Sequence, residues 1–225
     1  MERNFIFENE KGIFDLIENK GVLIDIPNIP LSQRRFETKE IDGKNGTYTI
    51  DKKTYKDRYV TLKTTFQEKP ILDIFDGTGG RLHINNEDAF YKVKFVENVD
   101  ENDEEWKYDI DFTMLLEPFK YLREEKIIID EPTVLFNPTN LENELYIKIY
   151  GDGDITLKIN NETIALYNIE SYIELDSEIQ ECYKGNERKN RLMEGDFPVF
   201  NVGENTISWT GNVSKIEIIP RWRCL

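Results

Sequence analysis

The sequence feature that most constrains the fold is a strict two-residue alternation of apolar and polar side chains. Apolar Trp106, Tyr108, Ile110, Phe112 and Met114 alternate with Lys107, Asp109, Asp111 and Thr113. Successive side chains of a strand point to opposite faces of a sheet. The pattern therefore predicts a β-strand with one face on a core and the other in water.

Shorter alternations of the same kind recur along the chain, at intervals of roughly ten residues and with turn-forming residues between them. The clearest are Tyr59–Phe66, Tyr91–Phe95, Leu145–Ile149, Ile155–Ile159 and Ile169–Leu175. The composition agrees, because 13 Phe and 11 Tyr stand against only two alanines, and aromatic residues favour sheet over helix. We predict an all-β protein built from β-sandwich or jelly-roll domains.

A proline-containing stretch separates the alternating runs into two groups. Three prolines punctuate it, and an isoleucine run lies between charges: Pro118, Pro132, Pro138 and Ile127–Ile129. We predict a first domain over residues 1–124, a connector over residues 125–137 and a second domain over residues 138–225.

Glycine and asparagine pairs predict tight turns, because these residues adopt positive φ at little cost. Asp42-Gly43 and Asn45-Gly46 predict an extended hairpin arm near residues 36–50. Gly151–Asp154 and Gly211-Asn212 predict two further hairpin turns in the second domain. In the last hairpin we expect Trp209 and Ile218 in the core and Pro220–Arg223 anchored rather than frayed.

Charge and cysteine content exclude several classes of function. A formal net charge of −15 argues against sequence-specific nucleic-acid binding and against an anionic membrane surface. No apolar run approaches the roughly 18 residues of a membrane span, and the opening residues lack the apolar core of a signal peptide. Cys182 and Cys224 have no metal-binding spacing, so we expect synthesis in a reducing compartment.

Motifs that could carry chemistry are incomplete. His83 is the one histidine, and Asp76–Gly80 lacks the Lys-Ser or Lys-Thr of a phosphate loop. Gly151–Asp154 supplies only part of a calcium site, and the acidic run Asp100–Glu105 is typical of a solvated loop. We predict no catalytic, cofactor-binding or metal residues, no cofactor and no enzymatic activity, and the binding residues stay unknown.

Several stretches together resemble the siphophage distal tail proteins, the Dit family, of phages and prophages of Gram-positive hosts. In the second half these are Met193–Pro198, Gly203–Ser208, Gly211, Val213–Arg223, Gly151–Asn160 and Tyr172–Ser177. In the first half they are Ile26–Gly43, Leu72–Tyr91 and Asp111–Phe119. The chain departs from the family at Glu117–Tyr121, where Pro-Tyr-Tyr is usual, and in the acidity of residues 97–105.

The resemblance implies a structural protein of the virion tail tip, made in the cytoplasm of the bacterial host. It implies a homohexameric ring, the hub between the tail tube protein and the tail-associated tip protein or baseplate. An N-terminal β-sandwich would form the ring. A galectin-like or carbohydrate-module-like C-terminal domain would project outward and support host adsorption through a receptor-binding protein or a cell-wall saccharide.

Two other functions stay open. The chain could be a carbohydrate-binding module acting in cell-wall recognition, with Tyr146, Tyr150 and Tyr172 as a sugar platform. The same tyrosines could equally be the outer face of a sheet packed on a neighbour. A glycosidase or peptidase is the third possibility, although no pair of carboxylates is singled out by the sequence.

Overall fold

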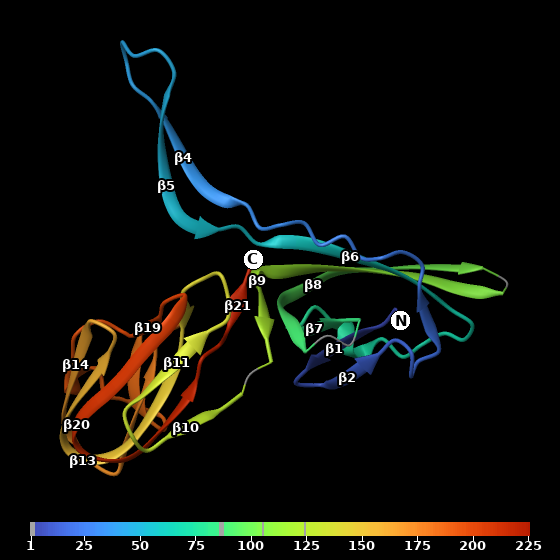
Figure 1. The fold of residues 1–225 in the computed structure, drawn as a ribbon. Helices are drawn as coiled ribbons and strands as arrows, with labels where there is room; N and C mark the ends of the chain where they lie inside the picture. Colours follow the sequence, from blue (N-terminus) through green and yellow to red (C-terminus); the bar gives the residue numbers. More distant parts are fainter. Residues whose placement is uncertain (1–2, 86–87, 105, 124) are drawn as a thin grey trace. The chain divides into compact units, whose positions relative to one another are not determined.

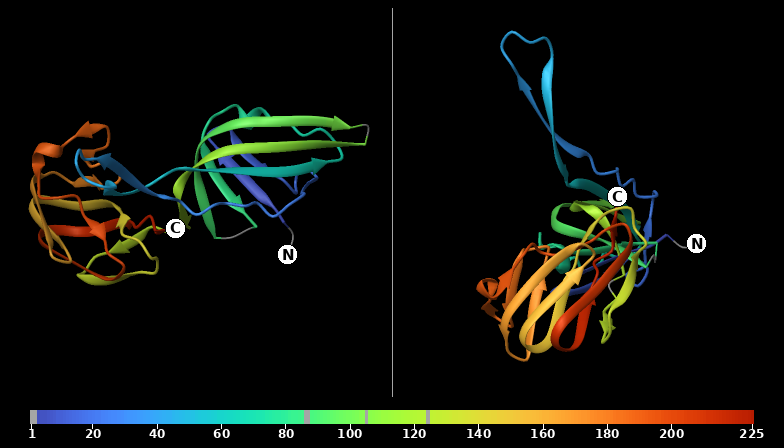
Figure 2. Two further views of the ribbon diagram at one scale, coloured as in Figure 1. Left: turned by 90° about the horizontal axis from the view of Figure 1, so that it is seen from above. Right: turned by 60° about the vertical axis from the view of Figure 1, so that its left-hand side comes forward.

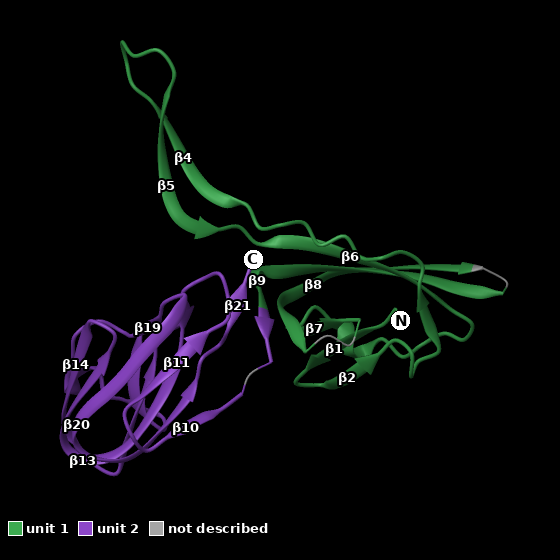
Figure 3. Cartoon of the chain, viewed as in Figure 1, with its two compact units in different colours: residues 1–120, 225 green, residues 121–224 purple. Residues whose placement is uncertain are grey.

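The computed structural model describes residues 3–85, 88–104, 106–123 and 125–225 of the chain (Figure 1). The predicted all-β class is confirmed, because strands dominate and the helical elements of the described residues are two short 3₁₀ turns. These turns are η1 (Asp73–Phe75) and η2 (Asn190–Leu192). The chain divides into two compact units, residues 1–120 with Leu225 and residues 121–224 (Figure 3).

The first unit is organised around one sheet with the strand order β2-β1-β7-β8-β9-β6-β3. The pairs β1–β2, β1–β7, β7–β8, β6–β9 and β3–β6 are antiparallel. The strands are β1 (Phe5–Asn9), β2 (Gly12–Asp15), β3 (Gly21–Leu23), β6 (Arg58–Phe66), β7 (Gly80–Ile84), β8 (Ala89–Glu104) and β9 (Lys107–Leu122).

The core of the first unit follows the alternation that the sequence predicts. Along β9, Ile110, Phe112 and Met114 are fully buried, and β6 buries every second residue against the same core. Phe112 packs on Phe75 with ring centroids 4.4 Å apart. Trp106 departs from the pattern, because it lies just before β9 and is 85% exposed.

The predicted arm is a separate two-stranded sheet of β4 (Arg34–Glu40) and β5 (Thr47–Tyr55). Its strands pair with each other and with no other strand of the described chain. Nearly every residue of the hairpin is exposed. Figure 1 and the right-hand view of Figure 2 show it standing away from the sheet of the first unit.

The second unit is built around two long antiparallel strands, β13 (Tyr146–Ile159) and β20 (Gly203–Ile219). They pair along β13 as far as Ile159↔Ile207, with two register shifts on the way. The first half of β13 also pairs with β15 (Tyr172–Asp176), and its second half pairs with β14 (Glu162–Ile169). The remaining strands are β10 (Ile127–Ile129), β11 (Thr133–Asn137), β12 (Asn143–Glu144), β16 (Glu181–Lys184), β17 (Glu187–Arg188), β18 (Met193–Glu194), β19 (Val199–Phe200) and β21 (Arg223–Cys224).

The two hairpin turns predicted in this unit are wrong. Gly151–Asp154 and Gly211-Asn212 lie inside the continuous strands β13 and β20, at a register shift where the strands pass each other closely. A Cβ on Gly151 would overlap the carbonyl oxygen of Asn212, and one on Gly211 would lie 2.5 Å from that of Asp154. The glycines therefore permit a close backbone approach rather than a chain reversal.

Much of the predicted connector is also sheet. Within residues 125–137, β10 pairs with Ile216–Ile218 and β11 pairs with Gly203–Ile207, on opposite halves of β20. Pro132 and Pro138 lie just outside β11, where a missing amide donor costs no ladder bond, whereas Pro118 lies within β9. Residue 124, the predicted end of the first domain, lies outside the described residues.

The core of the second unit consists mainly of isoleucine and leucine from β13, β14, β15 and β20. Ile218 is fully buried, as expected. The expectation for Trp209 holds only in part, because its side chain is half-buried and packs at the margin of this core. The indole opposes the fully buried Leu157 on β13.

Candidate functional sites: the anchored C-terminus and the projecting arm

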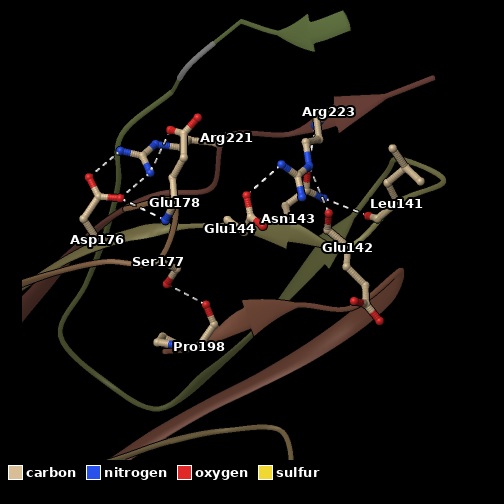
Figure 4. Close-up of polar contacts among 10 residues, drawn as sticks. All are labelled: Leu141, Glu142, Asn143, Glu144, Asp176, Ser177, Glu178, Pro198, Arg221 and Arg223. Carbon is tan, nitrogen blue, oxygen red and sulfur yellow. Dashed lines mark hydrogen bonds and ion pairs between the residues drawn. The ribbon is translucent and has the colours of Figure 1, made fainter. Parts of the chain in front are cut away.

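The closing residues of the second unit are held by charge-assisted hydrogen bonds (Figure 4). The guanidinium of Arg221 donates from Nη1 and Nη2 to the two carboxylate oxygens of Asp176, at 2.6 and 2.8 Å. Glu178 adds a third carboxylate oxygen at 3.3 Å. A bidentate arginine–carboxylate pair of this kind fixes both distance and orientation.

Two further residues anchor the same segment. Arg223 pairs with Glu144 at 2.8 Å, and its backbone amide donates to Oδ1 of Asn143 at 2.7 Å (Figure 4). Trp222 stacks on Phe200 with ring centroids 5.5 Å apart. These contacts agree with the expectation that Pro220–Arg223 is tied down, and the segment serves as a structural clamp.

The Arg221–Asp176 pair makes the second unit sensitive to acid. Burial alone would raise the pKa of Asp176, but the hydrogen bonds and charge of Arg221 outweigh it and lower the pKa. A carboxyl with a depressed folded-state pKa contributes stability above its unfolded pKa and loses it as the pH falls through the folded one.

We therefore expect the free energy of unfolding of the second unit to fall as the pH drops from about 5 towards 2. Glu217 adds to this, because Lys215 and Lys126 hold its pKa at about 2. Urea titrations across this pH range measure the slope. The Asp176→Asn variant should flatten it, and an unchanged slope in that variant would contradict this assignment.

The arm exposes apolar side chains that nothing in its own sheet covers. Phe36, Ile41 and Tyr48 are 57%, 49% and 52% exposed. The hairpin is also locally basic, since residues 34–55 contain six Lys and Arg against four Asp and Glu, in a chain of net charge −15. A lone two-stranded hairpin is marginally stable in water. These properties are typical of an assembly element.

The free edge of the first unit's sheet has a second exposed apolar row. β3 ends the strand order, and Val22 on β3 and Ile24 and Ile26 just after it are exposed. They are 58%, 46% and 66% exposed. Exposed apolar edges invite pairing with another chain, so this edge is a second candidate contact.

The structure places the motifs considered for chemistry apart from one another. His83 has Glu8 at 3.5 Å and packs its ring near Phe90. Oδ1 of Asp76 accepts a hydrogen bond from the Thr78 amide within the glycine turn. The ion pair with Lys11 helps to lower the pKa of Asp76 to about 2. Burial raises the pKa of Cys182 to about 11, which suits a packed thiol rather than a nucleophile.

The acidic stretches considered for calcium hold protein groups instead. Asp152 and Asp154 accept hydrogen bonds from the backbone amides of Ser171 and Asn168, at 2.8 and 2.9 Å. In the run Asp100–Glu105, Glu101 pairs with Lys69, and residue 105 lies outside the described residues. Over the part of the chain that the structure describes, no group of three metal-ligating side chains converges.

The three tyrosines proposed as a sugar platform belong to a cross-strand network on β13 and β15. The Tyr146 hydroxyl donates to Glu174 at 3.0 Å, and Tyr150 and Tyr172 face each other with centroids 6.0 Å apart. The Lys148 ammonium lies 4.0 Å from the Tyr172 centroid. Neighbouring side chains therefore cover part of these aromatic rings. Of the three tyrosines, only Tyr172 borders the polar cleft described below.

The sequence missed the most specific polar contacts. Arg221 and Asp176 are 45 residues apart, and nothing local marks them as partners. Arg223 and Glu144 are likewise far apart in the sequence, and no local pattern marks them as partners. No helix among the described ranges has the length and apolarity to cross a membrane.

Comparison with known proteins finds similarity in the fold but not in the sequence. The sequence matches no protein-family model and no curated protein. Among solved structures, however, the fold is similar to that of a phage distal tail protein.

The particular match is the crystal structure of Dit from phage SPP1, described as a paradigm of the hub adsorption apparatus in phages that infect Gram-positive bacteria. It aligns with a TM-score of 0.72 at 10% identity, over 97% of this chain and 99% of that one. The predicted resemblance to the Dit family is thus confirmed at the level of the fold.

Proposed function

We propose that the chain is a structural hub protein of a long non-contractile phage tail, located between the tail tube and the tail tip or baseplate. The observation that carries this proposal is the fold match to SPP1 Dit along almost the whole of both chains. A fragmentary match could reflect a common sandwich, whereas a match over 97% of this chain includes both compact units.

The exposed surfaces of the first unit support assembly into a ring. The arm and the β3 edge both expose apolar side chains, and they are different surfaces of one unit. Head-to-tail contacts between different surfaces close into rings when the rotation per subunit allows it. In this proposal six copies form the ring, the tail tube protein and the tail-associated tip protein flank it, and no catalysis is involved.

The second unit supports host adsorption in this proposal, through a receptor-binding protein or a cell-wall saccharide. The alternative is that the chain acts as a carbohydrate-binding module in cell-wall recognition. The observation that supports this alternative is the polar cleft beside Tyr172. Solution mass separates the two, because the hub forms rings and the module stays a monomer that binds polysaccharide.

Shortening the arm should weaken assembly without unfolding either unit. We expect replacement of Glu40–Tyr48 by a two-residue Asn-Gly turn to shift the protein towards smaller species, because the change removes Ile41 and Tyr48 from the hairpin. Light scattering measures the mass, and far-UV circular dichroism checks the sheet content. Tyr59→Ser, an exposed aromatic on β6 outside the arm, is the matched control. Unchanged assembly of the shortened protein would rule out this role for the arm.

A further inference from the structure

A polar cleft of about 450 Å³ lies at one edge of the second unit's sheet, beside β16 and β17. The β14–β15 turn and Tyr172 form one side, and Lys184, Glu187 and Lys189 contribute to the other. This volume is in the range of small-molecule sites, roughly 300–1,000 Å³. The hub role proposed above does not use the cleft; only the carbohydrate-binding alternative refers to it.

The turn that forms one wall is fixed from both ends. Asn168 and Ser171 have positive φ values of 52° and 63°. Their amides are held by the carboxylates of Asp154 and Asp152, which reach across from β13. Lys184 donates to the carbonyl oxygen of Glu170 at 2.8 Å. The wall is therefore preorganised, which lowers the entropic cost of binding a ligand there.

The opposite wall is fixed through its backbone. The amide of Lys189 donates to the carbonyl of Cys182 at 2.7 Å, and Oδ1 of Asn190 accepts from the Cys182 amide at 2.6 Å. Cys182 itself is fully buried. Hence the Lys189 side chain extends from an anchored position, with 31% of it exposed.

The segment beside the cleft is basic, in contrast to the whole chain. Among the charged residues that line the cleft itself, Lys184 and Lys189 are balanced by Glu170 and Glu187. Residues 184–191 contain four Lys and Arg and one acid, Glu187, within a chain of net charge −15. Glu187 pairs with Lys189 at 2.6 Å, but its side chain is 74% exposed. Exposed pairs of this kind contribute little, so an incoming anion can take the place of Glu187.

We propose that this cleft binds an acidic saccharide, a sugar carrying a phosphate or carboxylate group. Lys189 and Lys184 would hold the acidic group, and the Tyr172 side chain with the polar groups of Asn168 and Glu170 would contact the sugar. A rigid, partly aromatic pocket with a few convergent polar groups is the general form of such sites. The proposal rests on the proposed role in host adsorption and names the ligand class for it.

The test measures binding by the full-length protein to N-acetylglucosamine 1-phosphate, N-acetylglucosamine and inorganic phosphate, using ligand-observed NMR titration. The sugar phosphate should bind at least tenfold more tightly than either of the others. Equal binding of inorganic phosphate would reduce the cleft to a simple anion patch and overturn the proposal. Equal binding of the neutral sugar, or no binding of any probe, would overturn it too.

Two matched pairs of variants locate the site. Lys189→Glu should weaken sugar-phosphate binding at least tenfold, whereas Lys158→Glu, an exposed lysine on β13 outside the cleft lining, should leave it unchanged. Tyr172→Ala should weaken binding, and Tyr150→Ala, its cross-strand neighbour outside the lining, should not. Equal losses within either pair would contradict the assignment.

The test of saccharide binding can be separated from the test of the hub role. Electron microscopy of the same variants reports ring formation. Rings without saccharide binding would overturn the cleft inference alone. Saccharide binding without rings would overturn the hub and favour the carbohydrate-binding alternative.

Discussion

Replacing Gly211 with alanine should destabilise the second unit by about 3 kcal/mol or more. Gly211 has a φ of 104°, where a residue with a side chain is strained. Its new Cβ would also lie 2.5 Å from the carbonyl oxygen of Asp154 and 3.1 Å from the Cα of Ile155. These are backbone atoms of β13, so relief would require the two central strands to separate. Urea unfolding measured at neutral pH gives the loss.

Gly153→Ala is the matched control for this prediction. Gly153 lies on the partner strand β13 and also has positive φ, at 82°, but a Cβ there meets open space. Only the conformational strain remains, which costs about 1 kcal/mol. If both variants lose the same small amount, the close approach of β13 and β20 is not as the structure shows it.

Arg221→Ala should destabilise the second unit by about 3 kcal/mol, because removing one member of a buried ion pair leaves the other charge uncompensated. Asp176 is only 7% exposed and would be left beside the carboxylate of Glu178. Arg221→Lys should recover only part of the loss, since an ammonium cannot make the two parallel bonds of a guanidinium. The measurement is again the midpoint and slope of urea unfolding.

Arg223→Ala serves as the comparison at the same end of the chain. Its carboxylate partner, Glu144, has 40% of its side chain exposed, so water can replace the arginine. We expect a loss of about 1 kcal/mol. Equal losses for Arg221→Ala and Arg223→Ala would show that burial of the Asp176 pair does not decide its strength.

The parts of the fold that were predictable from the sequence are those with a local signal. The alternation that ends at Met114 places Ile110 and Phe112 in the core, and the Asn-Gly and Asp-Gly pairs correctly mark the arm. In both cases the side-chain period or the φ requirement acts within a few residues, so it does not depend on the rest of the chain.

The errors came from signals whose meaning depends on distant strands. A glycine at positive φ marks either a reversal or a close crossing, and Gly211 belongs to the second kind because β13 passes beneath it. The run Ile127–Ile129 resembles a linker in the sequence alone, but in the structure it is a strand that pairs with Ile216–Ile218. In both cases the conformation is decided by contacts with distant strands, and the local sequence does not indicate these contacts.

The arginine clamp links two of the stretches in which the sequence resembles the Dit family. Two of the similar stretches are Tyr172–Ser177 and Val213–Arg223, and the structure joins them through Asp176 and Arg221. In this chain, these stretches therefore hold the closing segment in place.

Electron microscopy of the purified full-length protein tests the central claim most directly. Negative-stain class averages, collected for the protein alone and after mixing with tail tube protein, show whether it assembles. The account predicts rings with six-fold symmetry that lose order when the arm is shortened. Monomers under both conditions, at micromolar concentration, would contradict the assignment of this chain as a tail hub.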